Sequence, residues 1–300
     1  MVNWRGRRKS TNVVDARGRR APMRGGRGMK LGGGLGTVGI IIAVVMFLMG
    51  ADPMQILSLL LGGGGGGPVV QQAPPPTQGN TQLGSDEGAQ FMSVVLADTE
   101  ETWGRLFREA GSRYPEPKLV LFTDSVQSAC GFGSAATGPF YCPGDRQLYL
   151  DLSFFRQLQQ MGAPGDFAQA YVIGHEVGHH IQNVTGVINR AQQLKSRSSQ
   201  ADANAIQVLV ELQADCYAGV WAHHAENRRD FLERGDVEEG LQAASAIGDD
   251  TLQRRAGRRV QPESFTHGTS EQRMRWFRTG FDTGEVGRCD TFAAAGVQLR

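Results

Sequence analysis

The sequence predicts an α+β fold, in which a mostly helical domain with a small β-sheet follows one transmembrane helix. Three observations lead to this class. Helical periodicity dominates the second half of the chain, at residues 167–185, 203–227, 237–247 and 270–280. Two short runs rich in β-forming residues, 117–124 and 147–155, precede these helices and are bounded by turn residues. An apolar run without charged residues lies near the N-terminus.

The N-terminal segment is strongly basic, with ten Lys and Arg in residues 1–30 against Asp15 alone. Residues 31–51 would form an uncharged helix about 30 Å long, the thickness of a bilayer core. We interpret this run as a retained anchor, because it and the basic segment before it are longer than in a cleaved signal peptide. The positive-inside rule then predicts residues 1–30 to be a cytoplasmic tail of an inner-membrane protein with a periplasmic domain.

The basic tail is rich in glycine and almost without aromatic residues, so we expect a membrane partner and no nucleic acid. Residues 52–88 contain an unbroken glycine run and many Pro, Gln and Ser residues, which predicts a flexible linker. The globular domain is expected over 89–300. The first helix of this domain should end at Gly111. The strand at 147–153 is either an edge strand or an internal strand of the sheet. Residues 189–202 are expected to form a polar connection between two helices.

All four cysteines follow the apolar run, in a compartment where disulfides would form. Cys130 and Cys142 flank a short loop, and this pair is the favoured disulfide among three possible pairings. Four buried free thiols are the alternative.

The segment FAQAYVIGHEVGHHIQNV places His175 and His179 four residues apart on one helical face, away from its apolar stripe. This spacing suits two ligands of one zinc ion. Glu176 is one residue further round the helix, where a carboxylate can take a proton from metal-bound water. His180 points away from His179 and is expected to be structural.

A hydrolytic zinc site needs a third protein ligand, and the next helix offers Glu211 and Asp215 on one face of an apolar stretch. Buried carboxylates are costly without a cation, so the pattern favours Glu211 as third ligand and Asp215 as acceptor from the free ring N–H of a ligating histidine. A surface acid pair is the alternative. His223 and His224 are rival ligands, but they lie three turns beyond Glu211.

At these residues the sequence resembles a known family. HEVGHH, ELQADCYAGVWA and SFTHGTSEQR are similar to motifs of the neutral zinc metallopeptidases, membrane-anchored proteins of bacteria, and HExxH followed by ExxxD also resembles the gluzincins, which include thermolysin. The resemblance spans about residues 85–300, the basic N-terminus and the apolar run. It implies a zincin-like fold with Zn²⁺ on His175, His179 and Glu211 and with Glu176 as general base. No counterpart of the calcium-rich loops of thermolysin is found, so calcium is not expected.

We therefore predict a membrane-anchored zinc endopeptidase that acts on a peptide or protein substrate. His267 is expected to assist the reaction by stabilising charge on the former carbonyl oxygen, with Arg273 as the alternative donor. The main rival function is a membrane-tethered binding or scaffold protein that keeps the metal for stability. An intact Glu176 favours chemistry, because a structural metal site needs no base.

Overall fold

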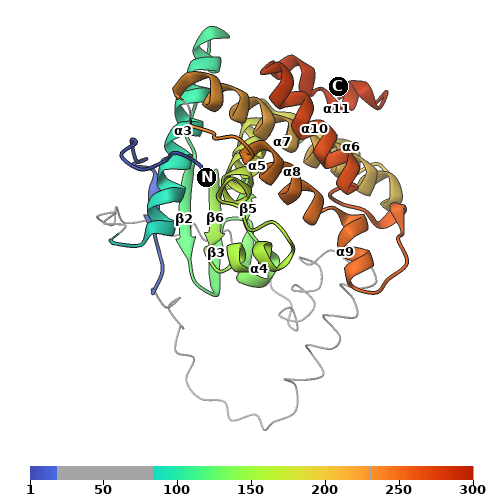
Figure 1. The fold of residues 1–300 in the computed structure, drawn as a ribbon. Helices are drawn as coiled ribbons and strands as arrows, with labels where there is room; N and C mark the ends of the chain where they lie inside the picture. The colour runs from blue at the N-terminus through green and yellow to red at the C-terminus, as the bar shows by residue number, and fades with distance from the viewer. Residues whose placement is uncertain (19–83, 230, 300) are drawn as a thin grey trace, which may run out of the picture.

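The computed structural model describes residues 1–18, 84–229 and 231–299, which form a small β-sheet beside a layer of helices (Figure 1). The strands are β1 Val13–Asp15, β2 Lys118–Phe122, β3 Ser125–Ser128, β4 Gly131–Ser134, β5 Phe140–Cys142 and β6 Gln147–Asp151. The helices are α3 Glu87–Glu109, α4 Phe154–Gln160, α5 Asp166–Val184, α6 Val187–Lys195, α7 Gln200–Arg229, α8 Asp236–Ala246, α9 Asp249–Arg255, α10 Ser270–Thr283 and α11 Thr291–Ala294. The expected α+β class, mostly helical, is confirmed.

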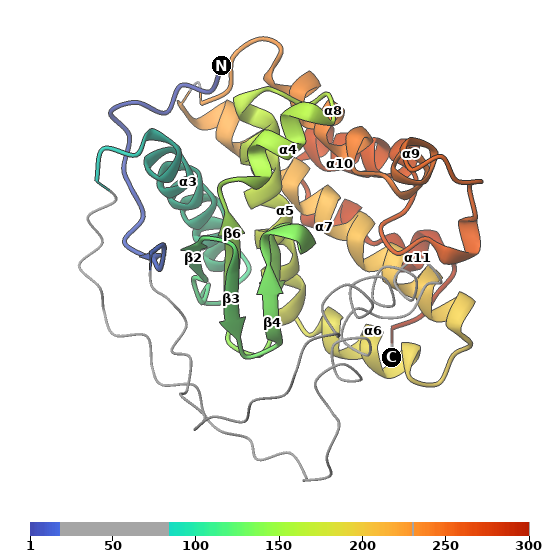
Figure 2. The same cartoon turned by 90° about the horizontal axis from the view of Figure 1, so that it is seen from below.

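The main sheet has the strand order β1-β2-β6-β5, and β3 and β4 form a separate hairpin (Figure 2). Strands β1, β2 and β6 are parallel, whereas β5 runs antiparallel to β6. Strand β6 therefore lies inside the sheet, and the interpretation of residues 147–153 as an edge strand is wrong. The edge strands of the described sheet are β1 and β5, and the short segment of β5 carries too little alternation to be recognised in the sequence.

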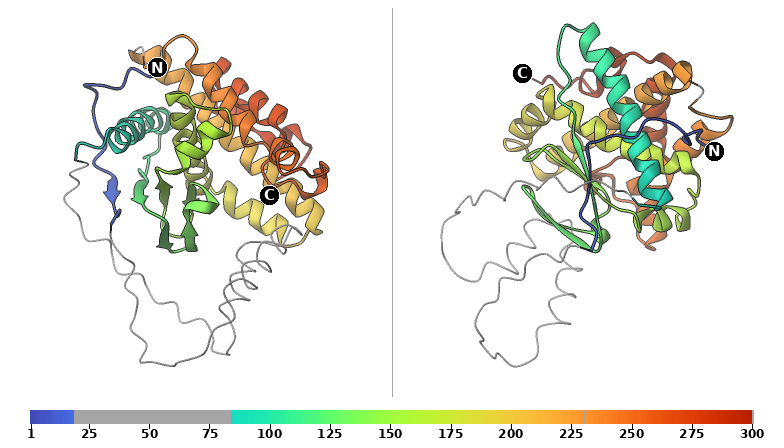
Figure 3. Two further views of the ribbon diagram at one scale, coloured as in Figure 1. Left: turned by 60° about the horizontal axis from the view of Figure 1, so that its bottom comes forward. Right: turned by 90° about the vertical axis from the view of Figure 1, so that its left-hand side faces the viewer.

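The two faces of the sheet belong to different hydrophobic clusters, because successive side chains of a strand point to opposite faces. Leu119 and Leu121 of β2 lie in the large cluster that includes α3, α5 and α7. Val120 and Phe122 lie in a smaller cluster with Tyr149 and residues of the hairpin. Figure 3 shows the helices on one side of the sheet and the hairpin apart from them.

Helices α5, α7 and α10 cross at very short distances. A Cβ atom added to Gly178 of α5 would lie 2.8 Å from the carbonyl oxygen of Ala214 in α7. A Cβ atom added to Gly280 of α10 would lie 2.0 Å from the carbonyl oxygen of Cys216 in α7. Only glycine permits such approaches of backbone to backbone. The three helices are thereby close enough for short side chains to meet between them.

The connection expected at residues 189–202 contains helix α6. Val187, Ala191 and Leu194 are spaced at i, i+4 and i+7, and this stripe packs in a satellite cluster with Val210 of α7. Three apolar positions among polar residues are a weak signal, and the helix depends on burial against α7 rather than on its own propensity.

The N-terminal residues belong to the domain, in contrast to the predicted separation of a tail at 1–30 from a domain at 89–300. Strand β1 pairs with β2 from Val13↔Leu119 to Asp15↔Leu121. Val2 is buried, and its amide donates to Asp166 at the start of α5 over 2.8 Å. Sequence reasoning missed this strand because three residues after a basic segment carry almost no periodicity.

This pairing conflicts with the predicted membrane topology, because two strands of one sheet must lie on the same side of a bilayer. The expected membrane helix at 31–51 and most of the predicted linker fall outside the described residues. Among the helices of the described ranges, none is both long and apolar enough to cross a membrane.

Deletion of residues 1–16 should lower the free energy of unfolding by at least about 3 kcal/mol, because it leaves a buried carboxylate without partners. Glu100 is 3% exposed and accepts hydrogen bonds from Arg8, Ser10 and Asn12. Urea unfolding would measure the loss, which should be smaller in a Glu100→Gln background. An unchanged unfolding curve would show that this segment is not part of the fold in solution.

Candidate metal centre

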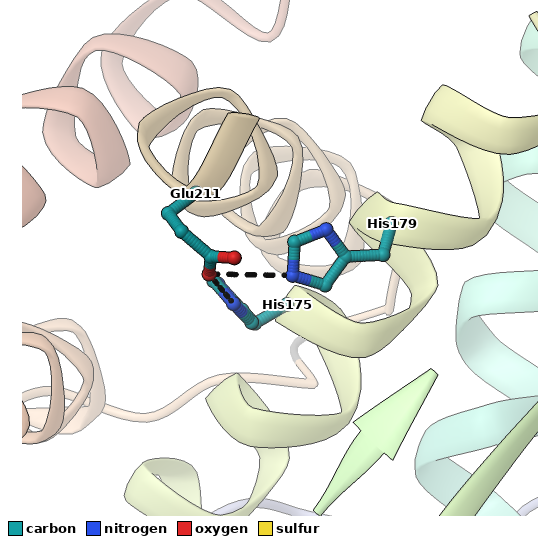
Figure 4. Close-up of side chains that lie close together, drawn as sticks. All are labelled: His175, His179 and Glu211. Carbon is teal, nitrogen blue, oxygen red and sulfur yellow. Dashed lines mark hydrogen bonds and ion pairs between the residues drawn. The ribbon is translucent and has the colours of Figure 1, made fainter. Parts of the chain in front are cut away.

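Two histidines and a glutamate meet where α5 passes α7 (Figure 4). Nε2 of His175 lies 3.1 Å from Oε2 of Glu211, and Nε2 of His179 lies 3.4 Å from the same oxygen. One ligand atom from each of the three residues lies within 4.8 Å of the other two. The structure thus brings together the three side chains that the sequence proposed as metal ligands.

The electrostatics of this cluster suit a cation. Burial would raise the pKa of Glu211, but the charge of His179 and the hydrogen bonds from both histidines hold it well below its usual range. Burial would lower the pKa of His175, whereas Asp215 and Glu211 raise it to about 9. Two imidazole nitrogens and one ionised carboxylate are a common ligand set of catalytic zinc, which keeps a fourth position for water. The residues present therefore fit the metal.

Asp215, the acid one turn after Glu211 on α7, is fully buried and lies behind His175. Its Oδ1 is 2.8 Å from Nδ1 of His175, opposite the Nε2 that faces Glu211. Tyr171 donates its hydroxyl to the same oxygen, and Arg273 of α10 donates Nε to Oδ2 over 2.8 Å. Burial would raise the pKa of Asp215, but Arg273 and His175 lower it to about 2. Asp215 thus stands where the sequence predicted an acceptor for a ligating histidine.

Two glutamines that sequence reasoning did not single out hold the other two ligands. Nδ1 of His179 is 2.9 Å from Oε1 of Gln182, one turn further along α5. Gln207 donates Nε2 to Oε1 of Glu211 over 2.8 Å, and its own oxygen accepts from Lys195. Because Oε1 of Glu211 is bound by Gln207, its Oε2 faces the two histidines. A polar residue three or four positions from a ligand on the same helical face was the available signal.

The cluster lines a cleft of about 590 Å³ that also holds the two proposed catalytic residues. Glu176 lies in its wall beside the histidines and is 8% exposed. The remaining wall is partly apolar, with side chains of α4, α6, α9 and nearby loops. Its apolar residues include Phe154, Met161, Ile188, Ile247 and Leu252.

His267 lies at the cleft on a loop before α10, with about half of its side chain exposed. Asp249, the first residue of α9, accepts the backbone N–H groups of Thr266, His267 and Gly268 at 2.6–3.0 Å. Nδ1 of His267 is 3.4 Å from the other oxygen of Asp249. The hydroxyl of Thr266 lies 3.1 Å from the same Nδ1. Asp249 therefore shapes the loop and, with Thr266, orients the ring, a role that the sequence did not reveal. Arg273, the alternative donor, is 1% exposed and is held by Asp215.

The other histidines of the described ranges lie outside the cluster. Nε2 of His180 is 2.5 Å from the carbonyl of Pro115, and burial lowers the pKa of His180 to about 4, in agreement with a structural role. His223 and His224 contact the carbonyl oxygens of Phe281 and Gly284 near the end of α10.

Two disulfides are present. Cys130 is joined to Cys142, the pair that the sequence favoured, and connects the hairpin to β5. Cys216 is joined to Cys289, so that α7 is tied to the segment after α10 directly beside Asp215.

Comparison with known proteins places this chain in a family. The family described as "Putative neutral zinc metallopeptidase" matches residues 2–292. The uncharacterized protein YpfJ of Escherichia coli is 45% identical over 293 residues, covering 97% of this chain and 99% of its own. The uncharacterized protein Rv2575 of Mycobacterium tuberculosis is 44% identical over 193 residues, covering 61% and 64% of the two chains. No solved structure was found to match.

The purified protein should carry about one zinc ion per chain, and Glu211→Ala should remove most of it. Glu226→Ala is the matched control, because Glu226 is an exposed acid on the same helix. Metal analysis after gel filtration would measure both. Stoichiometric zinc in Glu211→Ala would exclude Glu211 as a ligand.

Proposed function

The chain belongs to the neutral zinc metallopeptidase family, and we propose that it is a zinc-dependent endopeptidase. The observation that carries the proposal is the convergence of Nε2 of His175, Nε2 of His179 and Oε2 of Glu211 on the wall of a cleft that also contains Glu176. A structural zinc site has four protein ligands and needs no base. Three ligands, a carboxylate beside them and an open cleft support hydrolysis instead.

The residues of the metal cluster and their neighbours have distinct roles in this reaction. A bound zinc ion supplies a Lewis acid that lowers the pKa of water and polarises the peptide carbonyl. Glu176 accepts the proton that the attacking water loses and delivers it to the nitrogen of the leaving amine. Asp215 keeps a proton on Nδ1 of His175, so that Nε2 of this ring presents its lone pair.

The charge that develops on the former carbonyl oxygen needs a donor, and His267 is the available one. Its ring is anchored through Asp249 and half exposed at the cleft, so it can turn a ring N–H toward a bound peptide. Arg273 is less suited, because Asp215 accepts from both its Nε and one of its terminal nitrogens.

Strand β5 offers a place for an extended peptide. It is one of the two edge strands of the described sheet, and its residues Phe140 and Tyr141 line the cleft. A peptide that adds to this edge would form main-chain hydrogen bonds and present its carbonyl to the metal ligands. The apolar wall opposite, with Met161 and Leu252, favours apolar side chains near the cleaved bond.

Glu176→Gln should retain zinc and the wild-type melting temperature but lose peptide hydrolysis, since the amide has nearly the same shape and cannot accept a proton. Cleavage of a peptide library, followed by mass spectrometry, measures this. Equal activity of the variant would exclude Glu176 as the base. A wild-type protein that binds zinc but cleaves no peptide would instead favour the tethered scaffold.

His267→Ala should lower kcat/KM by roughly 10²–10³, the range for loss of one oxyanion donor, with zinc content unchanged. Glu263→Ala is the control, because Glu263 is an exposed side chain on the same segment before α10 and does not line the cleft. Unchanged turnover in His267→Ala would assign His267 to shaping the loop alone.

We propose that the domain works outside the cytoplasm, since its two disulfides are typical of oxidising compartments. Alkaline phosphatase fused after Arg300 should therefore be active, because it needs an oxidising compartment to fold. The same enzyme fused before Met1 should give the same result if β1 pairs with β2, whereas a single crossing at 31–51 requires opposite results. An inactive C-terminal fusion would place the domain in the cytoplasm. Membrane attachment through 31–51 remains a prediction.

A further inference from the structure

A chain of two buried amide side chains leads away from His179, and neither of them lines the cleft. Oε1 of Gln182 is 2.9 Å from Nδ1 of His179, and Nε2 of Gln182 donates to Oε1 of Gln213 over 3.0 Å. Nε2 of Gln213 donates to the carbonyl oxygen of Cys289 over 2.9 Å. Gln182 is 0% exposed, so its amide cannot exchange these partners for water, and Gln213 is 5% exposed.

The direction of this chain is set by backbone carbonyl groups, which can only accept hydrogen bonds. The carbonyl of Val210 lies 2.7 Å from Nε2 of Gln182, and that of Cys289 anchors Nε2 of Gln213. Both amide nitrogens therefore face away from the metal ligands, and both amide oxygens face toward them. If Gln182 were reversed, its oxygen would oppose the carbonyl of Val210 and the oxygen of Gln213.

The oriented amide determines which nitrogen of His179 carries the proton. Oε1 of Gln182 can only accept, so Nδ1 of His179 must donate to it. In the neutral ring, Nε2 is then the nitrogen whose lone pair can bind a metal, and this is the atom that lies 3.4 Å from Oε2 of Glu211. We propose that Gln182 and Gln213 are positioning residues that fix the ring and the proton of His179 for metal binding. The proposal rests on the metal site assigned above.

The choice of a neutral amide here, rather than a carboxylate, follows from the charges already buried. Asp215, Glu211 and Glu176 are carboxylates already buried around the histidines, and Arg273 brings one positive charge. A further carboxylate at position 182 would have to be buried against the carbonyl of Val210 without a donor. An amide supplies the acceptor that His179 needs and uses its two N–H groups to satisfy neighbouring oxygens.

Two substitutions at one position, made in the full chain, separate positioning from packing. Gln182→Met keeps the size but removes the acceptor, so zinc should bind 10–100-fold more weakly, the usual range for loss of a partner behind a metal ligand. Gln182→Glu keeps an acceptor, so zinc affinity should stay within about threefold of wild type. Both should lower the melting temperature, because both lose the donors to Val210 and Gln213.

Competition with a chromogenic chelator measures the zinc affinity, and thermal unfolding of the metal-free protein measures stability. Gln213→Met should weaken zinc binding less than Gln182→Met, because the bond from Gln182 to Val210 remains. Asn183→Leu is the matched control on the same helix. Asn183 donates to Tyr141 and contacts no ligand, so its loss should leave zinc affinity unchanged.

The proposal is overturned if Gln182→Met binds zinc as tightly as wild type, or if zinc affinity in both Gln182 variants simply follows the fall in melting temperature. A wild-type protein that binds no zinc would overturn the metal site and this inference with it. A wild-type protein that binds zinc without cleaving peptides would contradict only the proposed function, and the expected difference between the two variants would still support the positioning role.

Discussion

The short distance between α5 and α7 is the constraint on which the candidate site depends. Gly178 allows the backbone of α5 to lie directly on Ala214, where a Cβ atom would approach the Cα of Ala214 to 2.9 Å. Side chains of the two helices can then meet, and Nε2 of His175 lies 3.1 Å from Oε2 of Glu211. A similar approach of α10 to α7 lets Arg273 reach Asp215. Three helices from separate parts of the sequence thus share one polar interior that packing alone would not stabilise.

That interior is costly, and its stability depends on complete pairing of buried charges. Asp215 is balanced by Arg273, and Glu211 by two histidines whose other nitrogens are also occupied. Each ligand atom is therefore already oriented, and the ligand side chains need little rearrangement to bind a metal. The same pairing explains why substitutions behind the ligands should act on metal affinity as well as on stability.

The sheet is connected to the metal helix through Tyr141 of the edge strand β5. Neutral His180 donates Nε2–H to the carbonyl of Pro115, so its Nδ1 accepts from the hydroxyl of Tyr141. Asn183 donates to the same hydroxyl. The edge proposed to bind substrate is thus held at a set distance from the ligands on α5. The N-terminal segment forms the other edge of this sheet, which makes it part of the framework of the domain.

The sequence by itself determined the helical ligand pair at His175 and His179, the nearby Glu176, and the acid pair on α7, because these depend on spacing within single helices. It also indicated the α+β class and the disulfide between Cys130 and Cys142. Only the tertiary structure decided that β5 is an edge strand and that β1 joins the sheet. It also decided that Gln182 and Gln207 contact the candidate ligands and that Arg273 contacts Asp215. These contacts arise between elements far apart in sequence, where local periodicity carries no information about which side chains meet.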